Sequence, residues 1–125
     1  MIAVGLGFSS RCSSDELVTL VRETLTEIEG SAVLLCTHSR KAGAPVLEAA
    51  ARELGLPLRF LEQAELAAIQ DEAETRSERA VAEIGLASLA EAAALLGAGK
   101  HARLLVPRRA CAHATCAIAS GGDSR

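Results

Sequence analysis

The sequence is poor in aromatic side chains: among 125 residues it has two phenylalanines and neither tryptophan nor tyrosine. Proteins that bind single-stranded nucleic acid stack bases on such rings, so the composition excludes that class. The chain also lacks an excess of positive charge, because 13 Lys and Arg stand against 16 Asp and Glu. Duplex nucleic acid requires a basic surface, and we therefore expect no nucleic-acid partner.

Long apolar runs are absent as well. No segment approaches the roughly 20 apolar residues that cross a bilayer. No basic segment precedes the apolar start of the chain, as a signal peptide would require. The four cysteines, Cys12, Cys36, Cys111 and Cys116, follow no zinc-knuckle spacing. We therefore expect no membrane association, reduced thiols without a metal, and a cytoplasmic location.

Short apolar runs alternate with helical patterns along most of the chain. The patterns predict strands at residues 2–6, 32–36, 58–61, 103–106 and 113–119, and helices at 13–30, 45–54, 62–70 and 88–96. In this interpretation Gly30 stops the first helix and Pro107 stops the fourth strand. Six residues join the last two strands, which is too short for a parallel crossover, so an antiparallel hairpin is expected there.

This alternation predicts an α/β fold. We expect a single domain over residues 1–119, followed by a disordered tail at residues 120–125. The expected architecture is a three-layer α/β/α arrangement around a mixed, mostly parallel sheet of about five strands.

A segment rich in glycine and serine follows the first strand. Gly5 and Gly7 begin like a dinucleotide-binding fingerprint, but Ser10 stands at its sixth position and no acid follows the second strand. The simpler interpretation is that the glycines allow a tight turn. Ser13 and Glu16 form a capping box, and the N–H groups at such a helix start bind carboxylate or phosphate. A nucleotide- or phosphate-binding domain is therefore one hypothesis.

Cationic side chains are expected at one edge of the sheet. Arg11 lies beyond the first strand, Lys41 beyond the second and Arg108 beyond the fourth. Ligands of open α/β sheets bind beyond the carboxyl ends of the strands. These residues predict a rim suited to an anionic ligand with several carboxylates.

The alanine-rich segment at residues 88–96 holds a second capping box, Ser88 with Glu91. Capping is the simpler role for Glu91, and the alternative is that it lines a pocket floored by small alanines. A catalytic pair of Cys12 or Cys111 with His113 is a further alternative, but nothing in the sequence places a base beside either thiol. Catalytic residues therefore stay unassigned.

At these same residues the chain resembles the cobalamin-biosynthesis family formed by CobE proteins and the C-terminal domain of CbiG proteins, most closely the free-standing CobE members. The segments that carry the resemblance are Gly5-Leu6-Gly7, Lys41-Ala42 with Pro45, residues 54–58, residues 88–95 (SLAEAAAL), residues 104–108 and Thr115 with residues 117–119. Ser9 and Ser10 stand where the family has two arginines, and His113 stands where it often has asparagine. Two acids of the family are also missing around residues 43–44.

The resemblance implies a part in making the corrin ring. CbiG proteins open a lactone on a cobalt-precorrin and release acetaldehyde. We expect instead a binding or accessory protein for a precorrin or corrinoid intermediate of the aerobic pathway, alongside other corrin-biosynthesis enzymes and with no cofactor. A CbiG-like lactone hydrolase is the alternative. The candidate ligand-binding residues are Gly5, Gly7, Arg11, Ser13, Lys41, Ser88, Glu91, Arg108 and Thr115.

Overall fold

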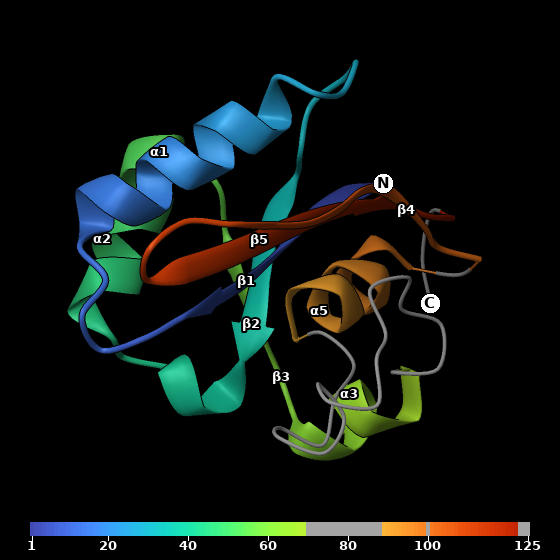
Figure 1. The fold of residues 1–125 in the computed structure, drawn as a ribbon. Coiled ribbons are helices and arrows are strands. Elements are labelled where there is room, and N and C mark those ends of the chain that lie inside the picture. Colours follow the sequence, from blue (N-terminus) through green and yellow to red (C-terminus); the bar gives the residue numbers. More distant parts are fainter. Residues whose placement is uncertain (70–88, 100, 123–125) are drawn as a thin grey trace.

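The computed structural model describes residues 1–69, 89–99 and 101–122 (Figure 1). The described residues form five strands, four α-helices and one short 3-10 helix. The elements are β1 (Ile2–Phe8), α1 (Ser14–Leu25), β2 (Leu34–His38), a short 3-10 helix η1 (Ser39–Lys41), α2 (Pro45–Leu54), β3 (Leu58–Leu61), α3 (Gln63–Ile69), α5 (Leu89–Ala98), β4 (Arg103–Ala110) and β5 (Ala114–Ser120).

The strands form one sheet in the order β3-β2-β1-β5-β4. β1 pairs in parallel with β2, and β2 with β3, whereas β5 is antiparallel to both β1 and β4. The α/β class, the five strands and the antiparallel hairpin are confirmed. The expectation of a mostly parallel sheet is wrong, because the described pairings are divided evenly between parallel and antiparallel. β5 alone runs against the other four strands.

Helices pack on both faces of this sheet. Val4 and Ile118 lie in an apolar cluster with α1 and α2, whereas Ala3 and Ala117 lie in a second cluster with α5. Successive strand residues point to opposite faces, which explains this division. Figure 1 shows α1 and α2 on one side of the strands and α5 and α3 on the other.

α5 lies close to the backbone of β1. A Cβ atom built on Gly5 would collide with the carbonyl oxygen of Ala90 and lie 2.5 Å from the backbone nitrogen of Ala94. Gly5 therefore serves the approach of helix to strand and not a tight turn, since β1 continues through it to Phe8. The alanine-rich sequence of α5 meets the same need, because small side chains allow close packing of elements.

The predicted boundaries are wrong at β2 and β4, and β1 continues two residues further than expected. β2 begins and ends two residues later than expected, which places Thr37 and His38 in the sheet. Both are buried, and Thr37 Oγ1 donates to the carbonyl oxygen of Leu6 at 2.9 Å. β4 continues through Pro107, because it is an edge strand whose register shifts on both sides of Val106. Edge strands with bulges tolerate a proline that a central strand would not.

The first helix and the end of the chain also differ from expectation. α1 ends at Leu25 rather than near Gly30, since the backbone N–H of Thr26 turns back to the carbonyl oxygen of Glu23. Ser120 belongs to β5, and Gly121 exchanges two backbone hydrogen bonds with Met1, at 2.9 and 3.0 Å. The expected tail therefore does not begin at residue 120. Among the described helices, none combines the length and apolarity of a bilayer-spanning segment.

Candidate functional site

An open pocket of about 410 Å³ lies at the carboxyl end of β1. Its lining comes from residues 7–9 at the end of β1, Leu89 at the start of α5, Arg108 of β4, and residues 111–115 around the β4–β5 turn. The end of β1, the start of α5 and the β4–β5 hairpin are distant in sequence and meet at this edge of the sheet. Pockets of this size are typical of small-molecule sites.

Gly7 and Thr115 face each other inside the pocket. They are register partners of β1 and β5, and the Thr115 hydroxyl lies 3.5 Å from the carbonyl oxygen of Gly7. A Cβ atom on Gly7 would stand 2.8 Å from Thr115 Oγ1. Glycine at this position therefore leaves room for the hydroxyl, a group that can both donate and accept a hydrogen bond.

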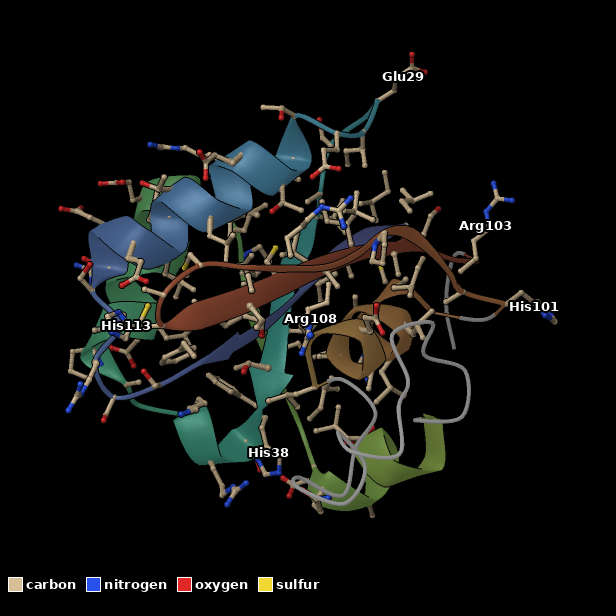
Figure 2. All side chains as sticks on the ribbon, in the orientation of Figure 1. Glu29, His38, His101, Arg103, Arg108 and His113 are labelled. Atoms are coloured by element: carbon tan, nitrogen blue, oxygen red, sulfur yellow. The ribbon has the colours of Figure 1, made fainter. Side chains whose placement is uncertain are left out.

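A buried carboxylate binds the backbone of Arg108. Its backbone N–H donates to Glu91 Oε2 at 3.0 Å, and Glu91 has no exposed surface. The register of β4 is irregular between Val106 and Arg109, and in that stretch Glu91 of α5 accepts the N–H of Arg108. Figure 2 shows Arg108 beside α5. The guanidinium group remains available to the pocket, because the contact with Glu91 uses only the backbone.

A second carboxylate, Glu16 of α1, holds the turn between β4 and β5. Glu16 Oε2 accepts from the backbone N–H of His113 at 2.9 Å and from the thiol of Cys111 at 3.2 Å. Glu16 Oε1 lies 3.0 Å from His113 Nδ1. These hydrogen bonds, from His113 first and Cys111 second, lower the pKa of Glu16. The turn that forms one wall of the pocket is thus fastened to the first turn of α1.

Lys41 stands beside the pocket and not within its lining. Its Nζ lies 4.8 Å from the ring centroid of Phe8, which does line the pocket. An ammonium group over an aromatic face is held by a cation–π attraction. One of the few aromatic rings of the chain therefore holds a cation next to a residue that lines the pocket.

The structure brings only part of the candidate set together. Gly7, Arg108 and Thr115 line the pocket, Lys41 adjoins it through Phe8, and Glu91 lies beneath Arg108. Arg11 and Ser13 belong to the neighbouring loop and are not part of the lining. The Ser13 hydroxyl accepts from the backbone N–H of Glu16 at 3.1 Å, so it caps α1 as expected. Gly5 is covered by α5, and Ser88 lies outside the described residues.

Glu16 and His113 were not among the candidate ligand-binding residues. They lie 97 residues apart, and the sequence marks Glu16 only as half of a capping box. His38, in contrast, is buried in β2, where its Nδ1 accepts from the backbone N–H of Arg40 and its Nε2 faces Gln63 Oε1. Its ring nitrogens therefore contact neighbouring parts of the fold, and His38 does not line the pocket.

Three of the four thiols are buried. Burial raises the pKa of Cys36 to about 12, does the same for Cys116, and raises the pKa of Cys12. Such thiols stay protonated near neutral pH and are poor nucleophiles and poor metal ligands. No disulfide joins them to Cys111, and no group of three metal-ligating side chains was found in the described part of the chain.

Fold and pocket together define a small protein of the mixed α/β class, with its site at the carboxyl end of the first strand. The chain belongs to the family described as cobalamin synthesis G C-terminus, whose model matches residues 2–119. This match confirms the resemblance found in the sequence and makes the chain a member of a cobalamin-biosynthesis family.

Relatives agree with this assignment over nearly the whole chain. Protein CobE of Sinorhizobium sp. is 33% identical over 127 residues, covering 99% of this chain and 82% of the relative. The crystal structure of CobE, a protein from the cobalamin (vitamin B12) biosynthetic pathway, matches with a TM-score of 0.83 and 32% identity over 95% of this chain and 89% of that one. The cobalamin biosynthesis protein chiG from Agrobacterium tumefaciens matches with a TM-score of 0.78 and 31% identity, over 98% of this chain and 100% of that one.

Proposed function

We propose that this protein binds a precorrin or corrinoid intermediate of the aerobic pathway in the pocket at the end of β1, as an accessory or carrier protein in the cytoplasm. Membership in a cobalamin-biosynthesis family supports the pathway. The observation that carries the binding proposal is the lining of the pocket, which places Arg108 and the Thr115 hydroxyl around one opening. Other corrin-biosynthesis enzymes are the partners we propose for delivery and release.

The chemistry of such intermediates suits this pocket. Precorrins carry acetate and propionate side chains, whose carboxylates are ionised near neutral pH. A guanidinium group binds a carboxylate through two parallel hydrogen bonds, and Lys41 offers a second cation beside Phe8. At about 410 Å³ the pocket accommodates the carboxylate-bearing edge of a tetrapyrrole, while the rest of the ring lies outside.

A visible-absorbance titration with hydrogenobyrinic acid tests the proposal. We expect saturable binding by the parent protein, and a loss of about ten- to a hundredfold in affinity for Arg108→Ala, as is typical for one charge-assisted contact. The variant keeps the backbone N–H that Glu91 accepts, so the fold should be preserved. Arg103→Ala is the matched control, because Arg103 lies on the same strand and is not part of the pocket lining.

The outcomes of this titration separate the proposal from its rivals. Equal affinities of parent and Arg108→Ala remove this pocket as the site, and no binding by the parent at low salt removes the carrier role. A lactone hydrolase gains some support from the Glu16–His113 contact, since a histidine oriented by a carboxylate is a common general base. Release of acetaldehyde from a lactone-bearing precorrin would establish that activity. Thermal stabilisation by nucleotides and not by tetrapyrroles would favour a phosphate-binding domain.

A further inference from the structure

The contact between Glu16 and His113 places an oriented imidazole in the lining of the pocket. We propose that His113, oriented by Glu16, binds one carboxylate of the ligand through Nε2, and that this binding takes up a proton on the ring. The inference rests on the proposed function, since it assigns a further residue and a form of pH regulation to the same pocket. His113 was outside the set of expected ligand-binding residues.

The orientation of the ring follows from two contacts with one carboxylate. Glu16 holds the backbone N–H of His113 at 2.9 Å and the ring atom Nδ1 at 3.0 Å. Ser9 at the end of β1 fixes the residue from the other side, because its N–H donates to the carbonyl oxygen of His113 at 2.9 Å. The imidazole is thereby attached to both α1 and β1, and it cannot turn away from the pocket without breaking a hydrogen bond.

The remaining ring nitrogen is available to a ligand. His113 lines the pocket and its side chain keeps 38% of its surface exposed. Within the parts of the chain that the structure describes, Nε2 makes no hydrogen bond. Figure 2 shows His113 at the end of the molecule where the β4–β5 turn lies. A carboxylate that enters beside Arg108 therefore finds a second polar contact from the same lining.

The proton requirement follows from what each atom donates or accepts. An ionised carboxylate only accepts hydrogen bonds, so the hydrogen between Glu16 and His113 belongs to Nδ1. In the neutral ring Nε2 then carries a lone pair and repels a ligand carboxylate. The protonated ring instead presents an N–H at Nε2 and donates to it. Binding of the ligand anion and protonation of His113 therefore reinforce each other.

Charged and titratable groups surround His113 from several elements. Glu16 comes from α1, Cys12 from the loop before it, Cys111 from the turn, and Arg108 from β4. The hydrogen bonds of the turn lower the pKa of Glu16, so this neighbour is an anion near neutral pH and accepts the hydrogen on Nδ1 of the ring. Arg108 lines the same pocket, so a ligand carboxylate placed between Arg108 and His113 can contact both side chains.

Calorimetric titration with hydrogenobyrinic acid tests the inference. At mildly alkaline pH, runs in buffers with different ionisation enthalpies measure the protons taken up per ligand bound. We expect a net uptake of a fraction of one proton for the parent and a smaller uptake for His113→Asn. Asparagine keeps a polar side chain but does not titrate, and it is the residue that the family pattern often carries at this position.

The pH profile of affinity gives a second readout. The parent should bind about tenfold more tightly than His113→Asn below neutral pH, and the two should converge as the pH rises. Glu16→Gln should also weaken binding below neutral pH, because it removes the carboxylate that accepts from Nδ1 and orients the ring. Arg108→Ala should weaken binding at every pH while proton uptake persists, so it is the matched control.

The results of these titrations test the role of His113 separately from the proposed function. Binding by the parent with the same proton uptake as His113→Asn overturns the role of His113 and leaves the proposed function intact. Parallel pH profiles of the two proteins overturn it as well. No binding by the parent at any pH overturns the proposed function, and the inference with it. Melting curves of His113→Asn without ligand should match those of the parent closely enough to exclude a loss of fold.

Discussion

The two faces of the sheet are packed in opposite ways. On the face of α1 and α2 the core consists of long aliphatic side chains, and Leu17, Leu35 and Ile118 are fully buried there. On the face of α5, alanine and glycine bring backbones together, and Gly5 leaves no space even for a methyl group. Packing on the first face therefore requires large side chains that fill the core. Packing on the second face requires small residues that let helix and strand backbones approach each other.

Carboxylates are also used differently on the two faces. Glu91 of α5 is fully buried and accepts one backbone N–H of β4. On the other face Glu16, in the first turn of α1, and Glu27, just beyond its end, reach the β4–β5 hairpin from partly exposed positions. Glu27 pairs with the guanidinium of Arg109 at 2.8 Å, which lowers the pKa of Glu27. The pocket lies where the two arrangements meet.

The largest expected effect comes from removing volume on the α1 face. Leu17→Ala should lower the free energy of unfolding by about 2–5 kcal/mol, because a fully buried leucine leaves a cavity behind. Urea unfolding measures this loss. Val33→Ala is the control, since Val33 is 45% exposed and should change stability little. Equal losses for the two variants would contradict the dependence of this face on side-chain volume.

A smaller effect is expected from adding volume on the α5 face. Ala93→Leu should lower the free energy of unfolding by about 1–3 kcal/mol, because overpacking displaces neighbours in a filled core. Ala93 has no exposed surface. Ala49→Leu on α2 serves as the control, since Ala49 borders a shallow surface pocket with room for the larger side chain. A melting temperature of Ala93→Leu within a degree or so of the control would show that α5 is not tightly packed.

The smallest effect concerns the pH dependence of the α1 carboxylates. The pKa of Glu16 is lowered in the folded protein, so its contribution to stability is fully present above the unfolded pKa of about 4.3. That contribution is lost as the pH falls through the lower folded pKa. The melting temperature of the parent should therefore exceed that of Glu16→Gln near neutral pH, and the difference should shrink in acid.

A control for this measurement lies on α2. Glu53 and Arg22 are 3.8 Å apart with exposed side chains, and such a pair contributes little. Glu53→Gln should therefore change the melting temperature less than Glu16→Gln at every pH. A difference between parent and Glu16→Gln that grows on acidification would contradict the assigned role of this carboxylate.

Local chemistry in the sequence predicted several elements correctly. Ser13 caps α1 as the capping box indicates, Pro45 opens α2 and Gly55 closes it with a positive φ of 71°. The short link between the last two strands predicted their antiparallel pairing. These features depend on residues close together in the chain, where backbone preferences decide the outcome.

Features decided by tertiary contacts were missed. Pro107 predicts the end of a strand. The strand continues through it because β4 lies at the edge of the sheet and its register is irregular. Within the candidate set, Gly7, Thr115 and Arg108 meet at the pocket, whereas Gly5 serves packing alone. The contact between Glu16 and His113 joins α1 to a distant turn, and no spacing in the sequence signals it.

The position of β5 has a consequence for folding kinetics. This strand lies between β1 and β4, and its residues pair with β1 from Ile2 with Ser120 to Phe8 with Ala114. During synthesis β1 emerges first but must wait for nearly the whole chain before it gains this neighbour. Contacts of such large sequence separation slow folding. Until β5 arrives, β1 has one edge open to wrong partners, and that interval is when this chain is most exposed to misassembly.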